Sequence, residues 1–348
     1  MPKRLYDVVT IGSATQDVFL VSDEIELVKS KRFRTGVAEC VSLGSKIEVD
    51  KLFISSGGGA TNAAATFASL GFRTACLAKV GEDLTAQSIQ SDLERFGIDA
   101  SCLVRAKGQS GYSVLLTTKS GERTALVYRG VSGTLKESNL DWSLFERTRW
   151  VYLTSLGGNV NLAKKIVAAC KKTKTHLAWN PGMEEIKKGQ AEILELLEKD
   201  IDVFNVNREE AAALTRVSQE SILKLFTELH SGKNRVRIIT DGERGSYVCN
   251  GASCYRAGTS GKKSVSRTGA GDAFGSGVVA SLLQGNPSLG RLEPKKESLK
   301  NFLRPRHSLP CRFDLFELQP YEKTQRFPHP PHPRRRNQDA QTRTRHST

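Results

Sequence analysis

The segment Ser264–Leu283, SVSRTGAGDAFGSGVVASLL, places the single carboxylate of Asp272 directly after Gly269, Ala270 and Gly271 and before an apolar run. Backbone N–H groups at the start of a helix attract anions, and glycines allow these groups to converge on one anion. An aspartate beside them is placed to take a proton from a hydroxyl that attacks a phosphoryl group. The segment therefore predicts an anion hole with a neighbouring base. The alternative is a tight turn followed by a helix N-cap.

A second glycine-rich segment, GGGATNAAATFASLG, covers residues 57–71. It places Asn62 in the first turn of a helix made of small residues, where its amide can donate and accept hydrogen bonds with a polyol. The glycines do not have the G-x-G-x-x-G spacing of a dinucleotide fingerprint. The alternative interpretation is close helix packing.

The bulk composition is that of an ordinary soluble protein, with 348 residues, 38% hydrophobic and 26% charged. The chain has no apolar run of 18 residues and no apolar signal core near its start, which predicts a cytoplasmic protein without a membrane contact. Residues 286–348 hold 14 of the 52 Lys and Arg residues and 6 of the 37 Asp and Glu residues, and so carry +8 of the net charge of +15. More than half of the net positive charge therefore lies in this tail. This distribution argues against nucleic acid as a ligand of residues 1–285.

Strand-like runs alternate with helical patterns along most of the chain, which predicts an α/β fold with a mostly parallel sheet covered on both faces. Residues 111–130 depart from this rhythm and have the pattern of a β-hairpin. The seven cysteines are scattered without a Cys-x-x-Cys pair, so we interpret them as structural thiols. Cys249 and Cys254 flank NGAS and are predicted to lie on two strands of one hairpin.

Taken together, GGATNAAATFASLG and TGAGDAFGSG resemble the two signatures of the ribokinase (PfkB) family of sugar and nucleoside kinases. The intervening segments VVTIGSATQDVF, KVGED, NVNREEA and ITDGERGSYV resemble further elements of that family in the same order. The resemblance covers about residues 6–285.

The resemblance implies a three-layer α/β/α domain over residues 1–289 with a small β lid built from about 12–56 and 108–130. It also implies transfer of the γ-phosphoryl group of ATP to a hydroxyl of a small sugar such as ribose or fructose, with Mg²⁺ bound to the phosphates largely through water. The site residues that it implies fall into four groups. Asp272 is the base, and Gly269, Ala270 and Gly271 form the anion hole. Asp17, Gly58, Gly59 and Asn62 bind the sugar. Asn207, Thr240, Gly242 and Gly245 lie on the nucleotide side, and Glu210 is linked to the metal. Relatives often dimerise through the lid, which gives a homodimer as an expectation.

Three features depart from the family pattern. Ser266 stands where the family often has an aspartate of a monovalent-cation site, so the resemblance does not extend to potassium activation. About 40 residues separate Asp17 from the glycines, which weakens an assignment to ribose. After Gly285, the chain changes to a tail rich in Pro, Arg and His over residues 290–348, where the family has further helices that wall the adenine pocket.

We predict that this tail is disordered, because it cannot bury enough apolar surface to fold, and its abrupt change of pattern is typical of a shifted reading frame. Two alternatives follow for function: a nucleoside kinase of the adenosine kinase type, or a kinase-like protein impaired by the missing wall. The sequence does not identify the substrate, the phosphorylated hydroxyl or the oligomeric state.

Overall fold

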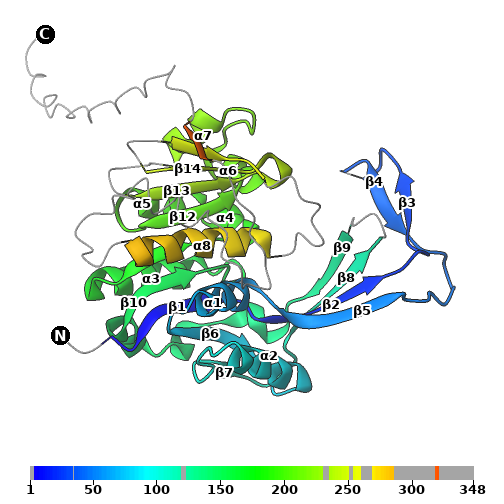
Figure 1. The fold of residues 1–348 in the computed structure, drawn as a ribbon, viewed down its shortest axis with the longest axis horizontal. Helices are drawn as coiled ribbons and strands as arrows, with labels where there is room; N and C mark the ends of the chain where they lie inside the picture. The colour runs from blue at the N-terminus through cyan, green and yellow to red at the C-terminus, as the bar shows by residue number, and fades with distance from the viewer. Residues whose placement is uncertain are drawn as a thin grey trace, which may run out of the picture.

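The computed structural model describes residues 4–33, 35–118, 123–229, 235–250, 254–259, 269–285 and 318–320. Within these residues, ten strands form one sheet in the order β16-β15-β14-β13-β12-β11-β10-β1-β6-β7 (Figure 1). Their bounds are β1 Tyr6–Gly12, β6 Thr74–Val80, β7 Val104–Arg105, β10 Thr148–Leu153, β11 His176–Trp179, β12 Val203–Asn207, β13 Val236–Thr240, β14 Ser246–Cys249, β15 Cys254–Ala257 and β16 Leu318–Pro320.

The strands from β7 to β13 are parallel, and β14, β15 and β16 are antiparallel additions at one edge. Successive side chains along each strand point to opposite faces of the sheet. Because the strands of the parallel part are apolar along most of their length, both faces are apolar. On β10, Trp150 and Tyr152 pack on one face of the sheet, while Val151 and Leu153 pack on the other. The predicted α/β fold with a mostly parallel sheet is confirmed.

Helices cover both faces of this sheet, which gives the three layers expected from the resemblance (Figure 1). On one face lie α1 Gly59–Ser69, α2 Leu84–Arg95 and α8 Ala270–Gly285. On the other lie α3 Val160–Thr173, α4 Met183–Lys188, α5 Gln190–Lys199, α6 Arg208–Thr215 and α7 Ile222–Glu228. Short 3₁₀ turns are η1 Gly130–Thr134, η2 Glu137–Asn139, η3 Trp142–Arg147 and η4 Gly242–Arg244.

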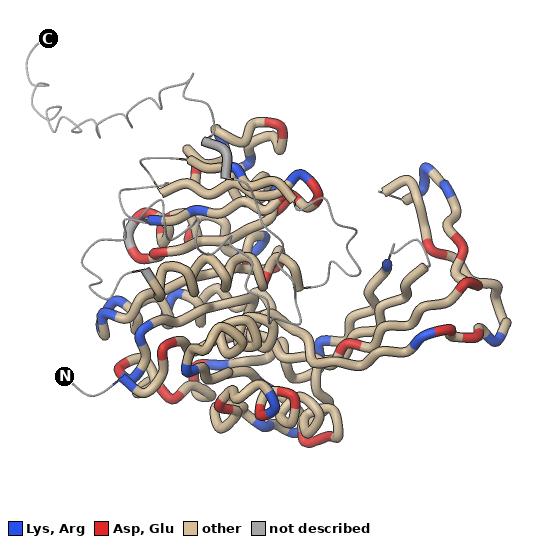
Figure 2. Tube along the Cα trace, viewed as in Figure 1, with Lys and Arg blue, Asp and Glu red and all other residues tan. Residues whose placement is uncertain are grey.

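A separate four-stranded sheet forms the lid and projects from one side of the three-layer body (Figure 1). Its strand order is β5-β2-β8-β9, with bounds β2 Thr15–Val21, β5 Lys51–Gly57, β8 Gly111–Thr117 and β9 Arg123–Tyr128. A two-stranded hairpin, β3 Glu26–Lys29 and β4 Val37–Cys40, stands at its far end. The middle of the lid strands carries few charged residues, as Figure 2 shows. β8 and β9 form the hairpin that residues 111–130 predict, and β2 and β5 correspond to the segment of about 12–56 that the resemblance assigns to the lid.

One prediction about the cysteines is wrong, because Cys249 and Cys254 form a disulfide. These residues are partners in the register of β14 and β15, so their side chains lie on the same side of the hairpin. The predicted hairpin strands are correct, but the bond was not predicted, because no spacing rule distinguishes two facing thiols from a disulfide. Cys40, Cys76, Cys102 and Cys170 are free thiols.

The C-terminal tail lies almost entirely outside the described residues, and with it the prediction that 290–348 is disordered. Within the tail, Leu318–Pro320 form β16, which pairs antiparallel with β15. None of the helices in the described part of the chain combines the length and the apolar character that a membrane span requires.

Candidate active site

Asn62 and Asp272, one from each glycine-rich segment, meet in the structure. Asn62 lies in the first turn of α1 and Asp272 in the first turn of α8, and the two helices lie side by side (Figure 1). Asn62 Nδ2 donates a hydrogen bond to Asp272 Oδ2 over 2.9 Å across 210 positions of sequence. Gly269, with φ +73°, precedes the helix, and a Cβ there would lie 3.3 Å from Asn62 Nδ2. The structure therefore brings the two predicted motifs into one cluster.

The Asp272 carboxyl group is held in surroundings that favour its protonated form. Burial raises its pKa above the ordinary value, the hydrogen bond from Asn62 lowers it, and the negative charge of Asp17 raises it further. Burial is the largest of the three causes, so the pKa is raised overall. A carboxylate with a raised pKa is a stronger proton acceptor than one in water, which suits a general base.

Backbone N–H groups at the start of α8 lie next to this carboxylate. The N–H group of Ala273 donates to Gly269 O over 2.9 Å, which is the first hydrogen bond of the helix. The earlier N–H groups therefore have no acceptor within the helix. Ala270 and Gly271 are exposed, so an anion can approach them. Ser266, at the position of the cation-site aspartate in relatives, lies outside the described residues.

Asp17 lies on β2 of the lid, where it is buried beside Gly57. A Cβ at Gly57 would lie 2.0 Å from Asp17 Oδ2, so the close approach requires glycine. Thr15 Oγ1 donates to Asp17 Oδ1 over 3.1 Å. Burial raises the pKa of Asp17, and hydrogen bonds from Ser113 and Thr15 oppose this effect. Gly57 was not among the predicted residues, although it begins the GGG run that the sequence singles out.

Gly58 and Gly59, predicted to bind the sugar, pack against the turn between β1 and β2. Gly58 has φ +98°, and a Cβ there would lie 2.6 Å from Ser13 O. The N–H group of Gly59 donates to Ser13 Oγ over 3.1 Å. The close approach to Ser13 O explains Gly58, and a Cβ at Gly59 would lie 2.8 Å from the Thr154 side chain. The role of both glycines in substrate binding stays a prediction.

Asn207 and Glu210 cap the N-terminus of α6 reciprocally. The Asn207 Oδ1 atom accepts from Glu210 N over 2.8 Å, and Glu210 Oε2 accepts from Asn207 N over 2.8 Å. Asn207 ends β12 opposite Thr240, the last residue of β13. The predicted nucleotide-side residues Asn207 and Thr240 therefore lie at the same carboxyl edge of the sheet, where ligands bind in open α/β folds.

Glu210 lies within electrostatic range of the Asp272 cluster. Burial raises the pKa of Glu210 to about 6, the hydrogen bond from Asn207 N opposes this, and the charges of Glu209, Asp272 and Glu185 add to it. Nearby negative charges favour a cation at this place. The described residues contain no group of three or more His, Cys, Asp or Glu side chains arranged to hold a metal ion.

Gly242 and Gly245 shape the turn between β13 and β14. Gly242 has φ +56° and Gly245 has φ +92°, which favour glycine at both positions. A Cβ at Gly245 would lie 1.9 Å from Ala257 O of β15. The N–H group of Asp241 donates to Gly245 O over 2.8 Å and closes the turn. The turn thus adjoins Thr240 at the edge of the predicted nucleotide side.

The sequence analysis missed three residues where α8 meets the sheet: Gly275 in the helix, and Tyr152 and Asn205 on the strands beneath it. A Cβ at Gly275 would lie 2.4 Å from Asn205 Nδ2 and 2.5 Å from Tyr152 Oη, so the glycine admits both polar groups beneath the helix. Asn205 Nδ2 also donates to Gly271 O over 3.3 Å, which links β12 to the first turn of α8. The second glycine within the apolar GDAFGSG run was the available signal, because glycine inside a helix indicates a close approach.

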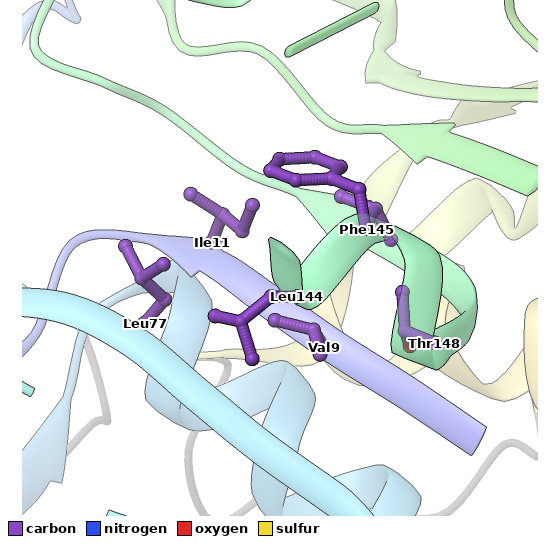
Figure 3. Close-up of a pocket in the computed structure, with 7 residues that line it drawn as sticks. Val9, Ile11, Leu77, Leu144, Phe145 and Thr148 are labelled. Atoms are coloured by element: carbon purple, nitrogen blue, oxygen red, sulfur yellow. The ribbon is translucent and has the colours of Figure 1, made fainter. Parts of the chain in front are cut away.

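A small hollow elsewhere in the fold carries no site. It lies between the sheet and η3 (Figure 3), is lined almost entirely by apolar side chains and leaves no room for a water molecule. The lining residues are Val9, Ile11, Leu77, Leu144, Phe145, Thr148 and Val151. We interpret it as a packing gap in the core.

Comparison with known proteins finds relatives over most of the described chain, including both glycine-rich segments. The family model of the pfkB family carbohydrate kinases matches residues 7–290. An uncharacterized sugar kinase of Archaeoglobus fulgidus is 28% identical over 225 residues, which are 62% of this chain and 85% of that protein. An ATP-dependent 6-phosphofructokinase of Thermoanaerobacterium thermosaccharolyticum is 25% identical over 294 residues, which are 81% of this chain and 83% of that protein.

Among solved structures, the adenosine kinase from Sinorhizobium meliloti superposes with a TM-score of 0.64 at 24% identity, covering 83% of this chain and 90% of that one. This likeness shows the ribokinase-like fold. The family match spans both glycine-rich segments, the lid and α8, which contain the Asn62–Asp272 cluster. The chain belongs to the pfkB family of carbohydrate kinases, enzymes that use ATP to phosphorylate small molecules.

Proposed function

We propose that this enzyme transfers the γ-phosphoryl group of ATP to a hydroxyl of a small sugar, with Asp272 as the general base. The observation that carries the proposal is the hydrogen bond from Asn62 to the partly buried Asp272 at the start of α8. The sugar oxygen attacks the γ-phosphorus, the bond from that phosphorus to the bridging oxygen breaks, and ADP leaves. The proton of the sugar hydroxyl passes to the Asp272 carboxylate.

The residues around Asp272 divide into two groups. Asp17 on lid strand β2 and Asn62 on α1 bind the sugar, together with Gly58 and Gly59 at the start of α1. The N–H groups of Gly269–Gly271 receive the charge that develops on the transferred phosphoryl group.

The nucleotide lies along the carboxyl edge of the sheet, against Asn207, Thr240, Gly242 and Gly245. Glu210 fits a metal-linked role here, because its carboxyl group lies near the negative charge of Asp272 and only one of its oxygens is tied to Asn207 N. When Mg²⁺ is bound, it neutralises the phosphate charge, and it keeps several waters because it dehydrates reluctantly.

The test is an ADP-release assay on the purified chain with ATP and Mg²⁺ across sugars, sugar phosphates and nucleosides. Asp272→Asn should lower kcat by about 10²–10⁴-fold while it leaves ATP binding nearly unchanged, because the base acts in the transition state. Glu146→Gln is the matched control. Glu146 is exposed and precedes β10, at the amino ends of the parallel strands, whereas the proposed site lies at their carboxyl ends. An unchanged kcat in Asp272→Asn would exclude Asp272 as the base.

The acceptor profile separates the two alternatives. If only a nucleoside is phosphorylated, the acceptor is a nucleoside and the proposed sugar acceptor is wrong. A folded wild-type chain that binds ATP but releases no ADP with any acceptor would indicate an impaired kinase.

We also propose that two copies of the chain pair through their lids. The outer lid strands expose large apolar side chains to solvent, namely Leu52, Phe53 and Ile54 on β5 and Leu126, Val127 and Tyr128 on β9. Patches of this kind mark interfaces more often than free surface. Ile54 and Leu126 share one face of the lid, because both lie in one row of paired residues through Val18 and Val114.

Sedimentation of the wild type and of an Ile54→Lys, Leu126→Lys variant tests the pairing. The variant should sediment as a monomer at concentrations where the wild type is a dimer. A monomeric wild type would refute the pairing without affecting the proposed reaction.

A further inference from the structure

Arg208 and Asp241 form an ion pair that is almost completely buried. Arg208 is the first residue of α6, and Asp241 directly follows β13. The Arg208 Nη1 atom lies 2.7 Å from Asp241 Oδ2, and the two side chains are only 10% and 4% exposed. Burying charges is costly unless they are paired and hydrogen-bonded, so this contact is specific rather than incidental.

The pair connects two segments that the proposed function assigns to the nucleotide. Arg208 directly follows Asn207, and Asp241 stands between Thr240 and Gly242. Asn207 and Thr240 are already opposite each other in the register of β12 and β13. The ion pair continues this connection beyond the ends of the strands, from the first turn of α6 to the turn between β13 and β14.

The Arg208 guanidinium is occupied by contacts within the protein. Its Nε donates to Gln219 O over 2.6 Å, and its Nη2 lies 3.5 Å from Glu220 Oε2. A group fixed in this way is not available to follow a phosphate through the reaction. Its role must therefore be exerted through the residues that it holds in place.

Asp241 is the common acceptor of two arginines. Arg244 donates to both of its carboxyl oxygens, at 3.0 Å from Nε and 2.9 Å from Nη2, but the Arg244 side chain is 64% exposed. Burial raises the pKa of Asp241, and the hydrogen bonds from Arg244 and Arg208 outweigh it, so the pKa is lowered overall. Asp241 therefore stays negative at neutral pH, where it can hold Arg208.

We propose that Arg208 and Asp241 are positioning residues for nucleotide binding: their ion pair holds the Asp241–Gly245 turn against the start of α6. The turn and the helix then present Asn207, Thr240 and Gly242 to ATP in one fixed arrangement. This inference rests on the nucleotide side of the proposed function. It goes beyond that function because neither residue is among those proposed to contact the nucleotide.

Direct measurement of ATP binding by calorimetry tests the pair without requiring turnover. Arg208→Met keeps most of the side-chain length and removes the charge, and it should weaken ATP binding by about 10–100-fold, the range typical of lost supporting contacts. Asp241→Asn keeps the shape and one acceptor, and should give a smaller loss. Arg244→Met removes the exposed arm of the same carboxylate and should change the ATP affinity less than threefold.

Steady-state kinetics separate positioning from a general loss of structure. In the active enzyme, Arg208→Met should raise KM for ATP while KM for the sugar at saturating ATP changes less than twofold. An Arg208→Met, Asp241→Asn double variant should lose little more than Arg208→Met alone, because partners in one contact are not additive.

Several results would overturn the inference. One is that Arg208→Met and Asp241→Asn both bind ATP as tightly as the wild type. Another is that Arg244→Met loses as much ATP affinity as Arg208→Met. A third is that Arg208→Met raises KM for ATP and KM for the sugar equally. If the wild type binds ATP and the variants lose affinity as expected, the inference holds even where no acceptor is phosphorylated, so its outcome is independent of the proposed reaction.

Discussion

Replacing Gly275 by alanine tests how tightly α8 is seated on the sheet. A Cβ at this position would lie 2.4 Å from Asn205 Nδ2 and 2.5 Å from Tyr152 Oη, whereas ordinary contacts are 3.4–4 Å. The helix, or the two polar side chains, must therefore move by about 1 Å to accept the methyl group. Asp272 lies less than one turn earlier in the same helix, so a movement of α8 displaces the carboxylate.

The expected loss follows from this displacement. A shift of about 1 Å in a catalytic group costs about 10²-fold in turnover, and the overpacked core loses about 1–3 kcal/mol of unfolding free energy. Helix propensity predicts the opposite sign for stability, because alanine is better than glycine inside a helix by about 1 kcal/mol. The sign of the stability change therefore decides between close packing and simple propensity.

The assay combines urea unfolding with kcat for the preferred sugar. Tyr152→Phe removes the hydroxyl that the methyl group would meet, so Gly275→Ala combined with Tyr152→Phe should recover part of the lost turnover, with Tyr152→Phe alone as the control. A Gly275→Ala variant that is more stable than the wild type and equally active would refute the reasoning.

Three further predictions concern the base, a buried arginine and the disulfide. Burial raises the pKa of Asp272 and the hydrogen bond from Asn62 lowers it, so Asn62→Ala should move the acid limb of the kcat profile to higher pH. The base must be ionised, and activity is lost as pH falls through its pKa; an acid limb that stays in place or moves to lower pH would contradict this. Arg237 is fully buried and donates to four backbone carbonyls, so Arg237→Met should lower the unfolding free energy by at least about 1–3 kcal/mol without changing kcat. Urea unfolding checks this, and a more stable variant would show that removing the buried charge outweighs the lost hydrogen bonds. Reducing agent should lower the unfolding free energy of the wild type by about 2 kcal/mol and leave a Cys254→Ser variant unaffected, and equal effects on both would contradict a stabilising disulfide.

The fold and the location of the main cluster could be predicted from the sequence because they depend on patterns of near neighbours. Alternating apolar runs gave the parallel sheet, and the hairpin pattern gave the lid. The two glycine-rich segments gave Asn62 and Asp272. The hydrogen bond between them could not be derived from spacing, because it depends on how α1 and α8 pack on the sheet.

The residues that the sequence missed act through close approach between distant segments. Gly57 and Gly275 leave room for polar groups of β2, β10 and β12, and the sequence shows the glycines but not the atoms that they admit. The Arg208–Asp241 pair was hidden for the same reason, since each residue alone has the character of a solvated charge. The disulfide was missed because a hairpin brings two cysteines together whether or not they are oxidised.

The position of α8 in the chain has a consequence for the newly made protein. At about 5–20 residues per second, the ribosome needs roughly a quarter of a minute to a minute to reach Ala270, where α8 begins. Until then, the core cluster that contains Trp150 and Ile238 lacks Val279 and Leu283 of α8, and α1 contributes to it only through Ala63 and Phe67. This cluster is therefore incomplete until α8 has been made. The nascent chain also lacks Asp272, the base proposed above, so on that proposal it does not turn over ATP before α8 has been made.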